Sequence, residues 1–525
     1  MRIGVFICHC GSNIAGTVDC AKVAELARAF PDVAYAADLM YSCAEPGQAA
    51  IEAAIHEHRL DGVVVASCTP RMHEPTFRRT VERAGLNRYM FEMANIREHV
   101  SWIGKDKEAN TNKAAELVQI AVEKLRRDRP LSAKSFDINK RVLIIGGGVA
   151  GIQAALDCAD GGVPVVLVER EATIGGKMAK LDKTFPTVDC SACILGPKMV
   201  DVAQHPNITL YAYSEVEDIS GYVGNFTVKI RRRPTYVDWS KCTGCGACTE
   251  KCPSKKTPDS FNEFTGPTTA INIAFPQAIP KKAVINPDHC RQLVKGKCGV
   301  CAKVCPTGAI NYDMREEIVT EEVGCIVAAT GYDLMDWTVY EEYGGGRYPD
   351  VITSLQYERL LSASGPTEGH ILRPSDGREP RNVVFIQCVG SRDRSIGRPY
   401  CSGFCCMYTA KQAVLTKDHI PDSQSYVFYM DVRAPGKLYD EFTRRAIEEY
   451  GTEYIRGRVS KIYPDGNGRL WCVAPTRSWA SRWKSLPISW CWPWALKPAR
   501  GRRNWRKNCV FPMTAMVSSW KATSS

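Results

Sequence analysis

The pattern of apolar residues divides the first 130 residues into alternating strands and helices. Short apolar runs predict strands at residues 2–7, 33–40, 62–66 and 88–92. Between them, apolar residues recur at helical spacing, most clearly over 21–30 and 47–56. Strands that alternate with helices are typical of a parallel sheet with helices on its faces. Residues 1–130 are therefore predicted to form a Rossmann-like α/β domain.

A second α/β pattern begins at residue 141. An apolar strand at 141–145 is followed by Gly146, Gly148 and Gly151, and a further strand at 165–168 ends at Glu169. In a dinucleotide site these glycines give a tight turn, a close approach to the pyrophosphate and close packing of the helix on the strand. The acid accepts hydrogen bonds from ribose hydroxyls. The combination predicts a dinucleotide-binding sheet.

Two further features favour FAD as the nucleotide. Gly175-Gly176-Lys177 follows the acid, and the strand that begins at 324 ends in Thr330-Gly331. Both features are typical of the FAD domain in two-dinucleotide flavoproteins. The predicted FAD-binding residues are Gly146, Gly148, Gly151, Glu169, Gly176, Lys177, Thr330 and Gly331.

The stretch 242–306 interrupts this domain with two cysteine runs, each ending in Cys-Pro. The first run has the spacing C-x2-C-x2-C-x3-C-P, which folds around a cubane iron–sulfur cluster and lends its fourth cysteine to a second cluster. The second run departs from this spacing, with seven residues between Cys290 and Cys298. The predicted ligands of one [4Fe–4S] cluster are Cys242, Cys245, Cys248 and Cys305. Those of the other are Cys290, Cys298, Cys301 and Cys252. A zinc site or disulfides are the alternatives.

Three more groups of cysteines are candidate ligands. Cys10, Cys43 and Cys68, with Cys8 close by, follow predicted strands at the sheet edge where ligands bind, although buried structural cysteines fit equally well. Cys190 and Cys193 have the C-x2-C spacing, which is typical of a redox dithiol or of cluster ligands. The many neighbouring cluster motifs favour cluster ligation. Cysteines of the N-terminal domain are possible further ligands of the same cluster. After a strand at 382–386, the phosphate loop of a second nucleotide subdomain is replaced by Cys388, Cys401, Cys405 and Cys406, which predict another cluster rather than a nicotinamide site.

Composition narrows the class of protein. The chain has 24 cysteines, and Met1 leads directly into a strand with no export signal, so metal ligation in a reducing cytoplasm is expected rather than structural disulfides. No apolar run is long enough to span a membrane. Residues 471–525 hold ten of the 68 Lys and Arg residues and none of the 57 Asp and Glu, so the rest of the chain is nearly neutral. The net charge of +11 therefore does not indicate nucleic-acid binding.

The segment 471–525 differs from everything before it. It contains eight of the eleven tryptophans and shows no sustained period of 3.6 or 2. Tryptophan has a single codon, UGG, and reading one base earlier turns the segment 490–495 into a small apolar strand that ends in glycine. We therefore predict a frameshifted translation from about residue 471, which would leave the end of the flavin domain missing and FAD weakly held. A genuine basic interaction tail is the alternative.

Together these motifs resemble the A subunit of heterodisulfide reductase. The matching stretches are 8–11, 67–75, 93–98, 189–195, the 242–306 runs and 401–406, within residues 1–465. The resemblance implies an FAD and iron–sulfur subunit that joins B- and C-like subunits and a hydrogenase or formate dehydrogenase. It also implies flavin-based bifurcation, in which one electron goes toward a disulfide and one toward ferredoxin. The alternative is a module that only conducts electrons, as in the related B subunit of the quinone-interacting oxidoreductase. The family continues beyond the length of this chain.

The expected fold class is α/β: a Rossmann-like N-terminal domain, then a thioredoxin-reductase-like FAD domain with an inserted α+β ferredoxin module. The predicted bounds are 1–130 for the first domain, 131–235 and 313–470 for the two parts of the FAD domain, 236–312 for the module and 471–525 for the tail.

Overall fold

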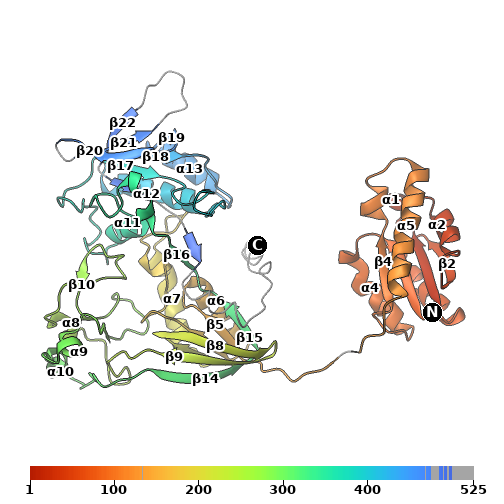
Figure 1. Ribbon diagram of the computed structural model, residues 1–525, viewed down its shortest axis with the longest axis horizontal. Helices are drawn as coiled ribbons and strands as arrows, with labels where there is room; N and C mark the ends of the chain where they lie inside the picture. Colours follow the sequence, from red (N-terminus) through yellow and green to blue (C-terminus); the bar gives the residue numbers. More distant parts are fainter. Residues whose placement is uncertain (133, 467–468, 475–483, 489, 493–495, 499–525) are drawn as a thin grey trace. The chain divides into compact units, whose positions relative to one another are not determined.

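The computed structural model of the 525-residue chain describes every residue except 133, 467–468, 475–483, 489, 493–495 and 499–525. The chain divides into two compact units, Met1–Phe136 and Asp137–Ser525 (Figure 1). No helix in the described part of the chain combines the length and apolar character that crossing a bilayer requires.

The first unit is a parallel four-stranded sheet in the order β2-β1-β3-β4. The strands are β1 (Ile3–Cys8), β2 (Val33–Leu39), β3 (Gly62–Ser67) and β4 (Phe91–Asn95). The helices are α1 (Ser12–Ala15), α2 (Cys20–Ala27), α3 (Glu45–Glu57), α4 (Pro70–Arg83), the π-helix η1 (Arg97–Ser101) and α5 (Lys107–Leu125). Apolar side chains of α2 and α5 fill the core on one face of the sheet, and those of α3 and α4 fill the core on the other.

The predicted start of the fourth strand is three residues too early. The Asn87 side chain accepts a hydrogen bond from the backbone N–H of Tyr89 at 3.0 Å, and the Asn87 carbonyl accepts from Met90 at 2.9 Å. These bonds close a turn, so pairing in the sheet begins only at Phe91.

The flavin part of the second unit also has a parallel sheet, in the order β15-β5-β6-β7. Its strands are β5 (Val142–Ile145), β6 (Val165–Val168), β7 (Ile208–Tyr211) and β15 (Cys325–Ala328). The helices α6 (Val149–Asp160) and α7 (Ser191–Gln204) cover one face. An antiparallel sheet of β8 (Ser214–Tyr222), β9 (Asn225–Arg232) and β14 (Glu317–Val323) covers the other.

The cysteine-rich module is inserted between two neighbouring strands of that antiparallel sheet. Arg232, the last residue of β9, pairs with Glu317, the first residue of β14. Inside the module, Val237 and Ile310 form a bridge that closes its base. Its short elements are α8 (Ala247–Glu250), β10 (Thr257–Pro258), β11 (Pro267–Thr268), β12 (Ile271–Asn272), β13 (Val284–Ile285), α9 (Arg291–Lys295) and α10 (Val300–Val304). The chain thus leaves and re-enters the flavin domain at one place.

The remaining part of the second unit is built on a parallel sheet in the order β19-β18-β17-β23. Its strands are β17 (Asn382–Ile386), β18 (Gln424–Tyr429), β19 (Glu453–Arg456) and β23 (Trp490–Trp492). The helices around it are α11 (Ser354–Leu361), α12 (Cys405–His419) and α13 (Tyr439–Glu448). A three-stranded sheet, β20 (Lys461–Pro464), β21 (Leu470–Ala474) and β22 (Lys484–Ile488), and the pair β16 (Tyr332–Leu334) and β24 (Leu496–Pro498) complete it. With this sheet the predicted α/β fold class is confirmed.

The predicted frameshifted tail lies mostly outside the described residues. Within the described part, 471–474 belongs to β21, and β22, β23 and β24 are short strands. No strands were expected from the written sequence there. The frameshift itself stays a prediction.

Candidate functional site

The first glycine loop lies at the carboxyl end of β5, where the parallel sheet ends. Gly146 has φ +105, and a side chain on it would collide with the Ala329 carbonyl, at the end of β15. A side chain on Gly151 would collide with the Gly146 carbonyl, so only glycine lets α6 pack this closely on β5. By contrast, a Cβ on Gly148 would meet no heavy atom within 4 Å. Gly148 is also the N-cap of α6 and provides no side-chain cap, so the first N–H groups of the helix stay available to an anion.

The second glycine loop lies against the first. Gly175 donates its backbone N–H to the Gly147 carbonyl at 2.7 Å, and a Cβ on Gly176 would lie 2.9 Å from the Gly148 Cα. Gly176 has φ +54, which also favours glycine. Lys177 follows directly, and burial together with the nearby Lys180 lowers the pKa of its ammonium group.

Glu169 is buried at the end of β6 and lies beside the first loop. Its carboxylate accepts hydrogen bonds from the backbone N–H of Gly147 at 2.6 Å and of Glu171 at 2.8 Å. Burial raises the pKa of Glu169, and these two N–H groups oppose the rise. Because each carboxylate oxygen can accept more than one bond, the side chain retains capacity for a ribose hydroxyl.

The end of β15 completes this edge of the sheet. Ala329 donates its N–H to the Ile145 carbonyl at 2.9 Å, and Thr330 therefore lies next to Gly146. Gly331 has φ +63 and turns the chain away toward β16. The predicted FAD residues thus gather at the carboxyl ends of β5, β6 and β15, the usual place for a nucleotide in such a sheet.

A cavity in the inserted module is lined by all four cysteines of the first predicted set. Cys242, Cys245, Cys248 and Cys305 surround it, together with apolar residues such as Ile273. Gly244 and Gly246 have φ +70 and +80, so the loop curves around the cavity as only glycine allows without strain. Burial and the nearby Cys242 thiol raise the pKa of Cys248 to about 11.

In a cubane each cysteine binds a different iron, so the four sulfurs are separated by the width of the cluster. A cavity lined by four cysteines fits such a group.

The second predicted set also comes together. Cys252, Cys290 and Cys301 are buried in the apolar core of the module. Burial raises the pKa of Cys301, and the nearby Cys290 and Cys252 thiols raise it further. The Tyr312 hydroxyl lies 3.0 Å from the Cys301 Sγ and is close to Cys298 as well.

The third set forms where β17 leads into α12. Cys388, Cys401, Cys405 and Cys406 all lie near one another, and Cys388 has φ +61. Burial and the neighbouring Cys406 raise the pKa of Cys388 to about 11. The Cys405 thiol donates to Cys406, and with the Arg433 N–H this lowers the pKa of Cys406. Cys406 is therefore the thiol of this set whose neighbours favour the thiolate form.

The cysteines of the first unit gather at the carboxyl edge of its sheet. Cys10, Cys43 and Cys68 lie around the Arg97 guanidinium, which donates to the Cys10 Sγ at 3.5 Å. Burial raises the pKa of both Cys43 and Cys68. A group of cysteines beside an arginine fits a metal site, and structural cysteines buried in a core fit as well.

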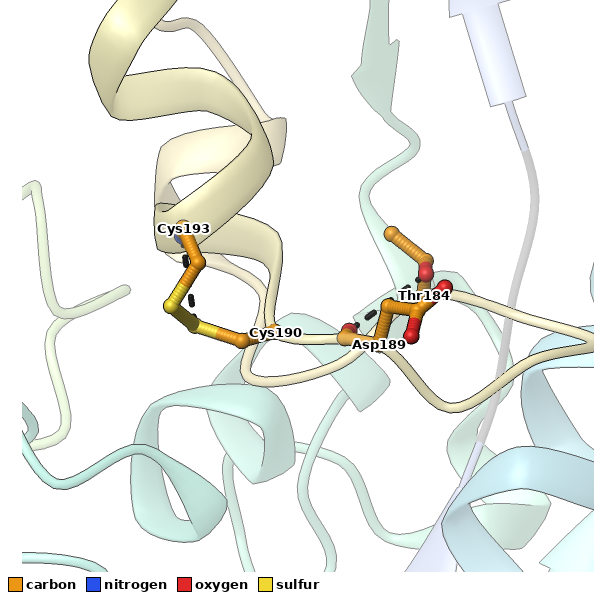
Figure 2. Close-up of a disulfide and its surroundings, with 4 residues drawn as sticks. All are labelled: Thr184, Asp189, Cys190 and Cys193. Atoms are coloured by element: carbon orange, nitrogen blue, oxygen red, sulfur yellow. Dashed lines mark hydrogen bonds between the residues drawn. A yellow bond between two sulfur atoms is a disulfide. The ribbon is translucent and has the colours of Figure 1, made fainter.

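The assignment of Cys190 and Cys193 as cluster ligands stays a prediction. They are joined in a disulfide at the start of α7 (Figure 2). A sulfur bonded to another sulfur is not a thiolate and cannot bind iron, so ligation requires prior two-electron reduction. The structure thus has the oxidised form of the redox dithiol, the less favoured interpretation. Ligation stays a prediction for the reduced protein alone.

Sequence reasoning missed two residues that contact the predicted ligands. Arg97 lies in the quoted stretch 93–98 but was given no role, and Tyr312 follows the second Cys-Pro step by six residues. Neither position belongs to a ligand-spacing motif, so only the folded chain brings them to the sulfurs.

Comparison with known families identifies both cofactor regions. Residues 141–189 match the model of FAD dependent oxidoreductases, and residues 241–309 match the 4Fe-4S dicluster domain. A thioredoxin reductase structure from T. acidophilum covers 68% of this chain and 78% of its own, at 12% identity and a TM-score of 0.36. The site and the two family matches define an iron–sulfur flavoprotein oxidoreductase that binds FAD and [4Fe–4S] clusters.

Curated relatives then define the family. The chain is 52% identical to the A subunit of the H(2):CoB-CoM heterodisulfide,ferredoxin reductase of Methanothermobacter marburgensis, over 88% of this chain and 69% of the relative. It is 55% identical to the second iron-sulfur A subunit of the CoB--CoM heterodisulfide reductase of Methanopyrus kandleri, over 88% and 70%. A relative from Archaeoglobus profundus, described as similar to this kind of subunit, is 49% identical over 90% and 72%. The chain belongs to the family of heterodisulfide reductase A subunits.

Proposed function

We propose that this chain is the FAD and iron–sulfur subunit of a complex that couples the reduction of a disulfide to the reduction of ferredoxin. FAD takes up electrons in pairs and passes them on singly, whereas each cluster carries one. A single scaffold that holds both kinds of group is what such coupling requires. The observation that carries the proposal is the position of the module, which leaves and rejoins the flavin domain at the paired strands β9 and β14.

The ligands of the module follow from its two cysteine sets. Cys242, Cys245, Cys248 and Cys305 hold one cluster, and Cys252, Cys290, Cys298 and Cys301 hold the other. The support is the shared cavity of the first set, the burial of Cys252, Cys290 and Cys301 in one core, and the proximity of Cys298 to the Tyr312 hydroxyl that contacts Cys301. The raised pKa of Cys248 means that gathering thiolates without a cation is unfavourable, and iron supplies the missing positive charge.

Cys388, Cys401, Cys405 and Cys406 hold a further cluster at the place of the second nucleotide loop. In the first unit, Cys10, Cys43 and Cys68 are the candidate ligands of another. Both assignments are supported by the proximity of the cysteines within each set. The lowered pKa of Cys406 supports the first, and the Arg97 guanidinium beside Cys10 supports the second. Cys190 and Cys193 join this scheme only when they are reduced.

The glycine loops hold the pyrophosphate of FAD. The uncapped N–H groups at the start of α6 donate to it, and the open space at Gly148 lets it approach the backbone. Glu169 accepts from the ribose, and Lys177 adds a positive charge at the end of the second loop. Thr330 and Gly331 contact the cofactor from β15.

The printed names of the relatives support the proposed reaction and its partners. One relative is called an H(2)-linked heterodisulfide and ferredoxin reductase, and another, from Methanosarcina acetivorans, a ferredoxin- and F(420)H(2)-dependent one. We expect B- and C-like subunits and a hydrogenase or formate dehydrogenase as electron donor. The disulfide is reduced in the partner subunits, and ferredoxin takes the other electron.

Purification of the native complex from its host tests this function. The complex is supplied with its electron donor, and ferredoxin reduction is followed with and without the heterodisulfide. Ferredoxin reduction that requires the disulfide, at one disulfide for each two ferredoxin electrons, supports bifurcation. If the rate of ferredoxin reduction is the same with and without the heterodisulfide, the chain is instead a module that only conducts electrons between partners.

A further inference from the structure

A tyrosine hydroxyl contacts one of the predicted ligands of the second cluster. The Tyr312 hydroxyl lies 3.0 Å from the Cys301 Sγ. Tyr312 comes two residues after Ile310, whose bridge to Val237 closes the base of the module, so the backbone of the tyrosine is well fixed. Its ring is half-buried against the core that contains Cys252 and Cys290.

The contact between the Tyr312 hydroxyl and the Cys301 sulfur lies in a buried place, which strengthens its electrostatic effect. Cys301, Cys290 and Cys252 are each less than a tenth exposed, so little water reaches their sulfurs. In such a place a hydrogen-bond donor compensates negative charge more effectively than it would at the surface. The described residues place no other side-chain hydroxyl within hydrogen-bond distance of a sulfur of this set.

We propose that Tyr312 donates its hydroxyl to the Cys301 thiolate and thereby raises the reduction potential of the second cluster. The inference rests on the ligand assignment proposed above. A sulfur that binds iron carries no proton, so of the two atoms only the hydroxyl can donate. Reduction adds negative charge to the cluster and its sulfurs, which strengthens the bond and favours the reduced state.

The hydroxyl contacts of the first set come from threonines rather than from a tyrosine. Among the first set, Cys305 accepts from the backbone N–H of Ala309 at 3.3 Å and lies 3.6 Å from the Thr307 hydroxyl. The Thr249 hydroxyl, next in the chain to Cys248, lowers the pKa of that thiol as a hydrogen-bond donor. Tyr312 is therefore a tuning residue for the second cluster alone.

The test compares Tyr312→Phe with a matched control, Tyr236→Phe, in the full-length chain with its cofactors. Tyr236 is adjacent, since its carbonyl accepts from the Asn311 N–H at 3.1 Å, and its ring packs on the same core. In the described part of the chain its hydroxyl has no hydrogen-bond partner. The potentials of the clusters are measured by redox titration with electron paramagnetic resonance, and iron content is measured in parallel.

Tyr312→Phe should lower the potential of one cluster and leave the others unchanged. We expect a threefold to tenfold shift in the one-electron reduction equilibrium, where tenfold corresponds to about 59 mV. Tyr236→Phe should leave all potentials as in the wild type. Unchanged potentials in a Tyr312→Phe protein with full iron content would overturn the inference.

Two further variants keep the outcomes distinguishable. If Tyr312→Phe loses iron, site-specific 3-fluorotyrosine at position 312 retains the ring and makes the hydroxyl a stronger donor. The potential should then rise, and an unchanged or lower value at pH 7 contradicts the proposal. Cys301→Ala tests the ligand assignment separately, because alanine offers no atom that can bind iron: full iron in that variant means that the proposed ligand assignment is wrong.

Discussion

Replacing Gly148 by alanine should weaken FAD binding without destabilising the fold. Gly148 has φ −76 and ψ 179, an extended conformation that alanine adopts without strain. Its Cβ would meet no heavy atom within 4 Å in the protein. The same methyl group would occupy the space through which the pyrophosphate approaches the start of α6. The substitution should therefore change the affinity for FAD and leave the stability of the fold nearly unchanged.

The magnitudes follow from these surroundings. Alanine is a poorer N-cap than glycine by about 0.5–1 kcal/mol, and the loss of backbone freedom in the unfolded chain offsets this by about 0.4–1 kcal/mol. The stability of the apoprotein should therefore change by less than about 1 kcal/mol. Loss of one hydrogen bond to a charged phosphate costs about 1.5–3 kcal/mol. Since about 1.4 kcal/mol is a factor of ten, FAD should bind roughly 10- to 100-fold more weakly.

The measurement is a titration of apoprotein with FAD, followed by quenching of flavin fluorescence, with thermal unfolding of the same apoproteins. Gly161→Ala is the matched control, because it lies at the other end of α6, has φ −73 and leaves room for an ordinary contact at 3.4 Å. Gly151→Ala should instead lower the thermal stability, because its side chain collides with the Gly146 carbonyl. FAD binding by Gly148→Ala as tight as that of Gly161→Ala would mean that the pyrophosphate does not pass over this loop.

Other properties of the chain can be tested as directly. Cys245→Ala should lower the iron content by up to about four atoms per chain, while Cys158→Ala, outside every predicted set, should leave it unchanged in the same assay. Lys411 and Glu358 form an ion pair at 2.8 Å, and each side chain is 1% exposed. Lys411→Met leaves the Glu358 charge buried without its partner, so it should destabilise the protein by about 3–5 kcal/mol in chemical unfolding. Adding Glu358→Gln removes that charge and should restore part of the lost stability. NADH should not bleach the flavin of the isolated subunit under anaerobic conditions; rapid bleaching would show a nicotinamide site. Resequencing of the codons for 466–471 should show a one-base slip, and an intact frame with a tail peptide in the native protein would exclude it.

Elements that depend on local sequence could be predicted well. The strands at 165–168 and 382–386 have the predicted bounds, because their apolar runs are bounded by a proline or a polar residue on one side and a polar residue on the other. The gathering of the first cysteine set around one cavity was also predictable, because its spacing alone brings three of the cysteines together. The fourth, Cys305, lines the same cavity, as the role of the Cys-Pro step in this kind of run predicts.

Contacts between distant segments could not be predicted. Glu358 on α11 meets Lys411 on α12 only because both helices pack on the same sheet, and neither position has a motif. The hydroxyl of Tyr312 reaches Cys301 for a similar reason, since the bridge between Val237 and Ile310 sets the path of the chain after the second Cys-Pro step. The pattern of apolar residues in a strand or helix predicts which face of that element is buried, but it does not predict which other element packs against that face.

The C-x2-C motifs of this chain show how one intervening residue changes the outcome. Cys245-Gly246-Ala-Cys248 and Cys190-Ser191-Ala-Cys193 differ in a single position. Gly246 has φ +80, so the chain turns before α8 begins and both sulfurs line the cavity. Ser191 is instead the first residue of α7, and the backbone N–H of Cys193 donates to the Cys190 Sγ at 3.2 Å. The backbone is thus helical at Ser191, where the two sulfurs are bonded, and left-handed at Gly246, where both sulfurs line the cavity of the proposed cluster.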